Sequence, residues 1–518
     1  GRSRRCGEPT ALVCTSGTAA ANFHPAVIEA HQSRVPLVVL TADRPAELQD
    51  SGANQTIDQE KLYGDSVRWY RTLPEPKPEA RALRSLRVSA CRAVERATGT
   101  PPGPVHLNVP FAKPLEPTEV DGDVPANLEE RAPLGSEGRE GPFINMRAGR
   151  PTLESEAVAD LAERVSQAER GLLVAGPATE PTPSRASLAA LAQATDFPVL
   201  ADPLSGHRFG HDDPLFCGGY DSYLDATGDW PDPEIVLRFG ASPTSKVLRH
   251  YLRDHAAEQV VVDPAGGWRE AEFTATDLVT ADPTWLAQRL AEQVAGSSDH
   301  WADRFQRAEQ THWEHVADAV ETEPFEGAVL STVARQAPDP ATLMVSNSMP
   351  VRDLDRFGAP QAADLTVLGN RGASGIDGIT STALGAGSAT DDPLVLVLGD
   401  LAFYHDMNGL LAIERCGVDA TVVLLNNDGG GIFHMLPIEK FDPPFTDYFK
   451  TPHGIDFEPV GDLYDLEYAI VDDLDGFETA YGESLDSAGT QILEVRLDAE
   501  ESHGVRDRLH ERVCEAVQ

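Results

Sequence analysis

The stretch that decides the fold is LVLVLGDLAFYHDMNGLLAIERCGVDATVVLLNNDGGGIF, residues 394–433. An apolar run ends in Gly399 and Asp400, apolar residues then recur at helical spacing, and a second apolar run ends in Asn426 and Asn427. Two parallel strands joined by a right-handed helical crossover have their carboxyl ends at one edge of the sheet. We therefore expect Asp400 and Asn427 to lie close together, where open α/β sheets bind ligands.

These two side chains predict a metal site beside a phosphate. A carboxylate oxygen and an amide oxygen are hard ligands that suit Mg²⁺. The three glycines at 429–431 let the backbone approach a diphosphate closely. Taken singly, Asp400 would be a helix cap and Asn427 a turn residue. Their spacing, with a strand before each, favours a shared cation and resembles the signature of thiamine-diphosphate enzymes.

The rest of the chain reads as further α/β units, because short apolar runs alternate with helical stretches throughout. The strands that we expect are residues 10–14, 36–41, 104–111, 171–177, 197–203, 234–240, 258–264, 342–348, 394–400, 421–427 and 491–497. The predicted organisation is a first domain at 1–113, a linker rich in proline, glycine and acidic residues at 114–150, a central domain at 151–298, a helical connector at 299–322 and a third domain at 323–518.

Length and composition agree with a soluble protein of several domains. The chain has 518 residues, 41% of them hydrophobic, and no apolar run approaches the roughly 18 to 20 residues that span a bilayer. The net charge of −41 and the lack of a basic face exclude nucleic acid as a partner. Dispersed acidic residues favour a cytoplasm of very high salt, where self-repulsion is screened. The 6 cysteines form no zinc or disulfide pattern.

Two weaker motifs have ordinary structural explanations. Residues 385–390, GAGSAT, nearly match a dinucleotide-binding fingerprint but lie inside a helical pattern, so close helix packing is the better interpretation. His312 and His315 lie on a charged helical stretch and could bind a metal, but we expect them on an exposed helix face.

Six motifs resemble those of one protein family. Five lie outside residues 394–433, and the sixth overlaps the end of that stretch. They are TSGTAAANFHPAVIEA (15–30), LTADRP (40–45), SGANQTI (51–57), NSMPVRD (347–353), NRGASGIDG (370–378) and NNDGGGIFHMLP (426–437). Together they are similar to the MenD family, the 2-succinyl-5-enolpyruvyl-6-hydroxy-3-cyclohexene-1-carboxylate synthases of menaquinone biosynthesis. The likeness covers nearly the whole chain in order and is weakest in the central domain.

The resemblance implies a transferase that decarboxylates 2-oxoglutarate and adds the succinyl carbanion to isochorismate. It implies three tandem doubly wound parallel-sheet domains: one binding the pyrimidine, a central one, and one binding the diphosphate. The implied cofactors are thiamine diphosphate and Mg²⁺ or Mn²⁺. The implied assembly is a cytoplasmic homo-oligomer, a dimer or tetramer, with its active site between subunits.

The resemblance also implies roles for single residues. The metal ligands would be Asp400, Asn427 and the carbonyl of Gly429. The cofactor would further contact Leu401, Gly430, Phe433 and Ile432, which would hold it bent. 2-Oxoglutarate would be bound by Ser348, Arg352 and Arg371, and isochorismate by Arg44 and Lys246. The substrate or the intermediate would be bound by Asn54 and Gln55. The pocket would be lined by Phe433 and Leu436. Gln55, Ser348 and Arg371 would act in catalysis. Taken one at a time, each arginine could instead be a charged residue on the solvent-exposed surface, and Ile432 and Phe433 could be residues of the hydrophobic core.

One departure from the family concerns its N-terminal glutamate, which protonates the pyrimidine ring and lies upstream of the segment matched by residues 1–23. Glu8 is not its counterpart. Because acid–base assistance contributes about 10² to 10⁴ in rate, we expect this chain to be impaired as an N-terminally truncated form.

Two alternative functions remain open from the residues. One is another 2-oxoacid enzyme of the same cofactor class, such as an acetolactate synthase. The other is a catalytically dead structural or regulatory subunit. The cluster of cations suited to dicarboxylates favours the synthase of the MenD family.

Overall fold

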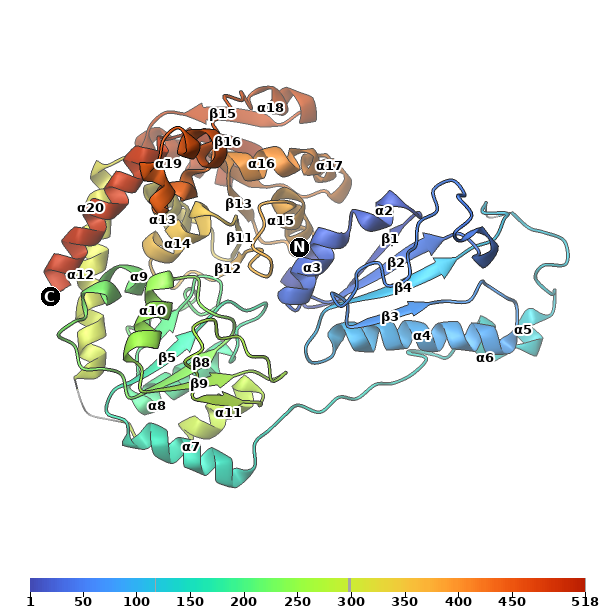
Figure 1. Cartoon of the computed structure of the whole chain (residues 1–518), viewed down its shortest axis with the longest axis horizontal. Coiled ribbons are helices and arrows are strands. Elements are labelled where there is room, and N and C mark those ends of the chain that lie inside the picture. Colours follow the sequence, from blue (N-terminus) through green and yellow to red (C-terminus); the bar gives the residue numbers. More distant parts are fainter. Residues whose placement is uncertain (117, 297–299, 518) are drawn as a thin grey trace. The chain divides into compact units, whose positions relative to one another are not determined.

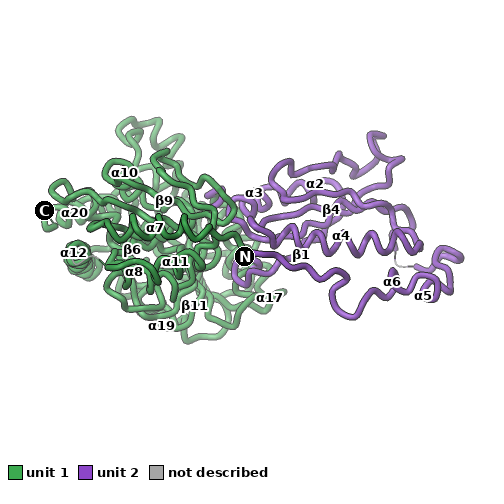
Figure 2. The backbone as a smooth tube through the Cα atoms, turned by 90° about the horizontal axis from the view of Figure 1, so that it is seen from below, with its two compact units in different colours: residues 1, 150–371, 375–518 green, residues 2–149, 372–374 purple. Residues whose placement is uncertain are grey.

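The computed structural model describes residues 1–116, 118–296 and 300–517. The chain forms two compact units, shown in Figure 2. Unit 2 comprises Arg2–Gly149 and Gly372–Ser374, and unit 1 comprises Gly1, Arg150–Arg371 and Gly375–Gln518. No helix of the described residues is long and apolar enough to cross a membrane.

Unit 2 is built on a parallel sheet with the strand order β1-β2-β4-β3. The strands are β1 (Thr10–Cys14), β2 (Leu37–Asp43), β3 (Trp69–Thr72) and β4 (Pro104–Pro110). The helical segments are α1 (Arg2–Cys6), α2 (Thr18–Ala21), α3 (His24–Gln32), η1 (Ala46–Leu48), α4 (Ala80–Thr98), α5 (Leu128–Arg131) and α6 (Pro133–Ser136). The long helix α4 covers the sheet through buried Ala93 and Ala97 (Figure 1).

The segment that we predicted to be a linker contains the short helices α5 and α6. Helix α6 docks on α4, where the Arg87 guanidinium donates to the backbone oxygens of Gly135 and Ser136, both at 2.6 Å. A side chain at Gly135 would lie 2.9 Å from the Cβ atom of Leu83. The short part of this segment around α6, where Ala132 and Gly135 are buried, is therefore packed within unit 2, and most of its other described residues are exposed.

Unit 1 holds two parallel sheets, ordered β10-β9-β8-β5-β6-β7 and β12-β11-β13-β14-β16-β15. The first has β5 (Gly171–Ala175), β6 (Val199–Ala201), β7 (Phe216–Cys217), β8 (Ile235–Phe239), β9 (Glu258–Val262) and β10 (Asp277–Val279). The second has β11 (Ala341–Val345), β12 (Leu365–Leu368), β13 (Leu394–Gly399), β14 (Thr421–Asn426), β15 (Glu467–Val471) and β16 (Gln491–Arg496).

Helices surround both sheets of unit 1 (Figure 1). The helical segments that accompany the first sheet are α7 (Ser155–Gln167), α8 (Arg185–Thr195), α9 (Tyr220–Tyr223), η2 (Leu224–Ala226), α10 (Lys246–His255), α11 (Pro283–Ala291) and α12 (Trp301–Thr322). The helical segments that accompany the second sheet are α13 (Glu326–Gln336), α14 (Met349–Phe357), α15 (Ile379–Gly387), α16 (Asp400–Asp406), η3 (Met407–Leu411), α17 (Ala412–Cys416), η4 (Gly431–Met435), η5 (Pro437–Lys440), η6 (Thr446–Lys450), α18 (Pro459–Tyr464), α19 (Leu474–Asp486) and α20 (Ala499–Val517).

The strand β13 shows why these apolar runs form doubly covered sheets. Alternate side chains of a strand point to opposite faces. Val395 and Val397 belong to one buried cluster, whereas Leu394, Leu396 and Leu398 belong to another. Both faces are thus covered, as a continuous apolar strand requires. The prediction of an α/β fold with parallel sheets is confirmed.

Every expected strand run coincides with a strand, but the sequence did not predict β3, β7, β10, β12 and β15. All of these lie at an edge of their sheet. An edge strand has a neighbour on one side only, and here such strands are short or only partly buried: β7 spans Phe216–Cys217, and β10 and β15 carry half-exposed residues. Their sequences therefore lack the long apolar run that marks a central strand.

A buried ion pair joins the two sheets of unit 1. Arg208 follows β6, and its guanidinium, which is fully buried, donates to Asp355 of α14 at 2.8 Å and to the backbone oxygen of Gly358 at 3.1 Å. It also donates to the Tyr220 hydroxyl at 3.0 Å. This explains why the predicted central and third domains form one compact unit. The predicted boundary at 298–299 lies outside the described residues.

The expectation for residues 385–390 is confirmed, because α15 ends at Gly387 in close packing. A Cβ atom there would meet Val418 at 2.7 Å and Leu394 at 2.9 Å. The expectation of an exposed His312 is wrong. Its side chain is fully buried against Gly219, where a Cβ atom would lie 2.3 Å from the ring, and His315 is half-buried. Helix α12 is packed on more than one side, and its charged sequence did not reveal this.

We expect His312 to make the stability of the protein fall in acid. Its Nε2 atom bonds the backbone oxygen of Arg356 at 3.0 Å, and Nδ1 has no hydrogen-bond partner in the described part of the chain, so the buried ring is neutral. Burial lowers the pKa of His312 to about 3, below the 6.5 of a free histidine. Because the unfolded chain binds the proton more readily, this stabilising contribution is complete above pH 6.5 and is lost as the pH falls toward 3.

Thermal unfolding followed by circular dichroism between pH 4 and 7 checks this expectation. The His312→Gln variant keeps a donor for the Arg356 oxygen, and its Tm should fall less steeply with acid than that of the original protein. Exposed His405 provides the matched control, and His405→Gln should leave the slope unchanged. Equal acid slopes in the His312 variant and the original protein would contradict the assignment.

Candidate cofactor and substrate site

The structure brings Asp400 and Asn427 to the carboxyl ends of two neighbouring parallel strands. Strands β13 and β14 pair in register, with Gly399 opposite Leu425. Helix α16 starts at Asp400 directly after β13, and Asn427 follows β14 directly. A backbone amide of the glycine turn after Asn427 binds the Asp400 carboxylate. This is the arrangement that the stretch 394–433 predicts.

The Asp400 side chain is buried, with 2% of its surface exposed. Its Oδ1 atom accepts from the Leu401 amide at 2.6 Å, and Oδ2 accepts from the Gly429 amide at 2.9 Å. Burial raises the pKa of Asp400, and these two hydrogen bonds oppose that shift. A carboxylate buried in this way gains from an adjacent cation, which would compensate its desolvation.

Asn427 presents an acceptor suited to a metal. Its Nδ2 atom donates to Oε1 of Glu326 at 2.6 Å, which fixes the orientation of the amide. Its Oδ1 atom is buried and has no hydrogen-bond partner among the described residues. A buried oxygen without a donor costs free energy, and a divalent cation beside Asp400 would satisfy it. The residues present therefore fit a divalent ion.

The glycines after Asn427 form a turn that no larger residue could adopt. Gly429 has φ 135°, and a Cβ atom there would lie 2.1 Å from the backbone oxygen of Lys450. The Gly430 amide donates to that oxygen at 2.8 Å. The carbonyl of Gly429, our predicted third ligand, accepts from the Gly431 amide at 3.0 Å and keeps a second lone pair for a metal. Glycine at 429 is thus required by the close approach of the Lys450 backbone, which holds the turn in place beside Asp400.

The apolar residues predicted to contact the cofactor follow in the 3-10 turn η4. Ile432 and Phe433 are both half-buried, and Phe433 packs edge-to-face on Phe449 with ring centroids 5.5 Å apart. Leu436, directly after the turn, is 45% exposed. Partial exposure beside the glycine turn suits pocket lining better than core packing.

Three predicted residues for 2-oxoglutarate lie around the start of α14. Ser348 precedes this helix with φ 73°, and its carbonyl accepts from Arg352 at 2.6 Å. Arg371 donates to Oδ1 of Asn347 at 3.1 Å. Burial, followed by the charge of Arg371, lowers the pKa of Arg352. Two guanidinium groups placed so close together favour the binding of an anion.

Lys246 is the exposed first residue of α10. Ser245 caps this helix, accepting from the Leu248 amide at 3.0 Å, and its hydroxyl donates to Asp221. The same Asp221 carboxylate accepts two bonds from Arg356, at 2.6 and 2.9 Å. Because Arg356 lies on α14 with Arg352, Asp221 links the helix of Lys246 to the helix of Arg352.

The predicted residues of unit 2 form their own group. An Arg44 guanidinium nitrogen lies 3.5 Å from the backbone oxygen of Asn54. Gln55 has the left-handed φ of 57°, and its amide donates to Oγ1 of Thr15 at 2.8 Å and to the Ser16 backbone oxygen at 3.0 Å. Arg44, Asn54 and Gln55 are therefore neighbours within unit 2.

Sequence reasoning missed several residues that support this site. His453 lies with Nε2 3.2 Å from Oδ2 of Asp400, and its Nδ1 accepts from the Ile455 amide at 2.9 Å. That bond leaves the proton on Nε2, facing Asp400. Glu326 accepts from the amide of Asn427, and Asp221 connects the helices that carry Lys246 and Arg352. None is in a motif that points to a site, whereas Asn347, which binds Arg371, directly precedes the predicted Ser348.

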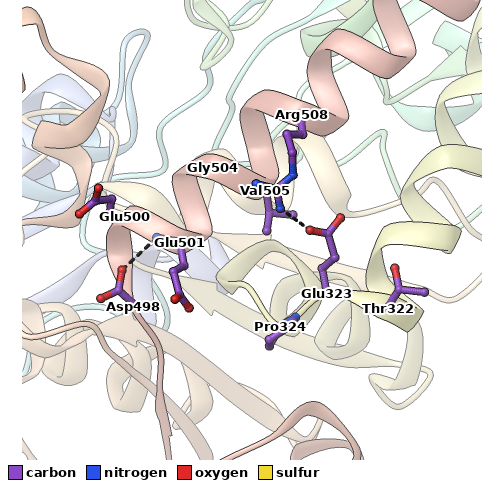
Figure 3. A pocket seen from close by; sticks show the side chains of 9 residues that line it. All are labelled: Thr322, Glu323, Pro324, Asp498, Glu500, Glu501, Gly504, Val505 and Arg508. Atoms are coloured by element: carbon purple, nitrogen blue, oxygen red, sulfur yellow. Dashed lines mark hydrogen bonds and ion pairs between the residues drawn. The ribbon is translucent and has the colours of Figure 1, made fainter.

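A groove of about 700 Å³ lies elsewhere in unit 1, between the end of α12 and the start of α20 (Figure 3). Its lining residues are Thr322, Glu323, Pro324, Asp498, Glu500, Glu501, Gly504, Val505 and Arg508. Asp498 accepts from the Glu501 amide at 2.9 Å, and Glu323 pairs with Arg508. Asp498 caps the positive end of α20, and no predicted site residue lines the groove.

Comparison with known families divides the chain into three matched segments. Residues 1–62 match "Thiamine pyrophosphate enzyme, N-terminal TPP binding domain". Residues 139–345 match "Middle domain of thiamine pyrophosphate", and residues 361–495 match "Thiamine pyrophosphate enzyme, C-terminal TPP binding domain". The crystal structure of benzoylformate decarboxylase from Polynucleobacter necessarius is 18% identical, with a TM-score of 0.71 over 96% of this chain and 88% of that one. This likeness shows the fold.

Closer relatives share one name, 2-succinyl-5-enolpyruvyl-6-hydroxy-3-cyclohexene-1-carboxylate synthase. The protein of Haloarcula marismortui is 61% identical and that of Natronomonas pharaonis 59%, each over 100% of this chain and 89% of the relative. The protein of Roseiflexus sp. strain RS-1 is 46% identical over 95% of this chain and 84% of its own length. The resemblance found in the motifs is confirmed, and the chain belongs to the MenD family of thiamine-diphosphate-dependent 2-succinyl-5-enolpyruvyl-6-hydroxy-3-cyclohexene-1-carboxylate synthases.

Proposed function

We propose that this protein is a transferase of menaquinone biosynthesis that releases CO₂ from 2-oxoglutarate and joins the remaining succinyl group to isochorismate. The observation that carries the proposal is that buried Asp400 lies beside the glycine turn together with Oδ1 of Asn427, which has no partner within the described ranges. The identity of 46% to 61% with synthases of this name supports the same reaction over the acetolactate alternative.

Asp400, Asn427 and the Gly429 carbonyl would hold Mg²⁺ or Mn²⁺, and the ion would hold the diphosphate of the cofactor. Thiamine diphosphate, when bound, supplies a thiazolium that accepts the electrons released with CO₂. Leu401 and Gly430 would contact the diphosphate through their backbones. Ile432 would keep the cofactor bent.

The cations of this chain would bind and orient the substrates. Arg352 and Arg371, with the Ser348 hydroxyl, would hold the carboxylates of 2-oxoglutarate. Each guanidinium matches a carboxylate with paired donors, which a lysine does not. In a protein of net charge −41, such a local concentration of arginine is what lets a dicarboxylate enter.

A second group would serve isochorismate. Arg44 and Lys246 would pair with its carboxylates, and Asn54 and Gln55 would donate hydrogen bonds to it. Phe433 and Leu436 would cover the reacting atoms and exclude water, which prevents protonation of the carbanion before it adds to the second substrate.

Assay of the purified protein with thiamine diphosphate, Mg²⁺, 2-oxoglutarate and isochorismate tests the proposal. Because we expect this chain to be impaired, CO₂ release should be slow, and it should accompany a product with the mass of the named synthase product. Acetolactate from pyruvate, with isochorismate unused, would instead support the alternative enzyme. A cofactor-dependent rise in Tm without turnover of any substrate would support a catalytically dead subunit.

The assembly and environment are part of the same proposal. We infer a cytoplasmic homo-oligomer, a dimer or tetramer, adapted to high salt, because 83 acidic residues face only 42 basic ones. Light scattering coupled to gel filtration, and Tm measured against KCl concentration, check these points. A monomer, or a Tm that falls as KCl rises, would contradict them.

A further inference from the structure

A chain of buried polar side chains leads away from the metal ligand Asn427. Asn427 donates to Oε1 of Glu326 at 2.6 Å, and the other oxygen of Glu326 accepts from Arg506. Arg506 also donates twice to Asp353, at 2.7 and 2.8 Å. Glu326, Arg506 and Asp353 are 1%, 4% and 1% exposed. Three helices, α13, α14 and α20, supply these groups, and Asp353 is next to Arg352.

This chain decides which end of the Asn427 amide faces the metal position. The oxygen and nitrogen of an asparagine amide have nearly the same size, so shape alone does not orient it. Both oxygens of Glu326 act as acceptors, Oε2 from Arg506 and Oε1 from the NH₂ group of Asn427, and this contact selects that end of the amide. The Oδ1 atom is then turned the other way, where it is buried and without a partner among the described residues.

Arg506 holds the Glu326 side chain in the position on which this selection depends. Its guanidinium lies between two buried carboxylates, Glu326 and Asp353, and so compensates the cost of burying them. A neutral group at 326 would lose this preference, because it could offer a donor as readily as an acceptor.

We infer that Glu326, held by Arg506, is a positioning residue of the metal site: it orients Asn427 so that an oxygen, and not an NH₂ group, meets the divalent cation. The inference rests on the proposed function only in placing that cation at Asp400 and Asn427. A hydrogen-bonding partner behind a metal ligand commonly contributes about 10- to 100-fold in metal affinity.

The Glu326→Gln substitution tests the inference at nearly constant volume. The charged Arg506 takes the single oxygen of the new amide, so the NH₂ group at 326 faces the NH₂ group of Asn427. Asn427 then turns over and presents its nitrogen to the cation. We expect the affinity for Mn²⁺, in the presence of thiamine diphosphate, to fall about 10- to 100-fold. The titration is followed by the electron paramagnetic resonance signal of free Mn²⁺, without substrates.

A reciprocal change separates orientation from general damage. In the double variant Glu326→Gln with Asn427→Asp, the amide at 326 donates to a carboxylate at 427, whose second oxygen faces the cation. We expect the double variant to recover most of the lost Mn²⁺ affinity. The single Asn427→Asp variant should bind Mn²⁺ worse than the double, because two carboxylates would then meet at the 2.6 Å contact.

Glu309 provides the matched control. It is also a buried glutamate, and it accepts from the Gly218 and Gly219 amides, the Tyr223 hydroxyl and Trp313, none of them a predicted site residue. Glu309→Gln should lower Tm without changing Mn²⁺ affinity. Unchanged Mn²⁺ affinity in Glu326→Gln would overturn the inference.

Circular dichroism of each variant first shows which ones fold. A folded double variant that binds Mn²⁺ no better than a folded Asn427→Asp variant also overturns the inference. Failure of the proposed function is seen separately, as a protein that binds Mn²⁺ and thiamine diphosphate but does not consume 2-oxoglutarate and isochorismate.

Discussion

The Asp400→Ala variant is expected to lose thiamine diphosphate binding almost completely, with an affinity at least about 100-fold below that of the original protein. Partners behind a metal ligand already contribute about 10- to 100-fold, and the ligand itself contributes more. The variant removes the one carboxylate among the three predicted metal ligands, and it also frees the amides of Leu401 and Gly429 that this carboxylate holds. Isothermal titration calorimetry with thiamine diphosphate and saturating Mg²⁺ measures the effect.

Asp406 is the control for this substitution. It is buried at the other end of the same helix, α16, where it accepts from the amide and hydroxyl of Ser381 at 2.7 and 3.0 Å. Asp406→Asn should bind the cofactor with nearly normal affinity. If Asp400→Ala bound thiamine diphosphate as tightly as Asp406→Asn, the metal site would have to lie elsewhere.

The Arg352→Met variant is expected to raise KM for 2-oxoglutarate by about 10- to 100-fold, since a hydrogen bond to a charged group contributes about 1.5–3 kcal/mol. Methionine replaces most of the buried stem and removes only the guanidinium. The loss should be specific to substrate, because Arg352 bonds the carbonyl of Ser348 and contacts no predicted metal ligand in the described hydrogen bonds. Initial rates at varied 2-oxoglutarate, together with the calorimetric affinity for thiamine diphosphate, separate the two effects.

Arg335→Met is the matched control for Arg352→Met. Arg335 lies on α13 and makes an exposed ion pair with Glu478 at 3.3 Å. Exposed pairs of this kind contribute about 0–1 kcal/mol to stability. The control should therefore keep both KM and cofactor affinity. A normal KM for 2-oxoglutarate in Arg352→Met would remove Arg352 from the substrate site.

Central strands and helices were predictable because their signals are local. Five consecutive apolar residues in β13 require cover on both faces wherever the strand lies, and the structure places Val395 and Leu396 in different buried clusters. Edge strands such as β12 and β15 were not predictable in this way. Each pairs with a neighbouring strand on one side only, and their apolar runs are shorter than that of β13.

His312 shows the same limit for a helix. The stretch around it is charged, which predicts solvent exposure, yet the ring is fully buried against Gly219 and the carbonyl of Arg356. Those two residues are far away in sequence. Burial on a long helix depends on which other elements pack against it, and a single amphipathic pattern does not contain that information.

The primary structure alone determined the kind of chemistry, because polar residues that follow apolar strands must gather at one end of a parallel sheet. That rule selected Asp400, Asn427 and the glycine turn. Tertiary packing alone decided how these groups are oriented: Glu326 sets the amide of Asn427, His453 faces Asp400, and Asp221 joins the helices of Lys246 and Arg352. Hydrogen-bond partners come from distant segments, and their positions exist only once the helices have packed around the sheets.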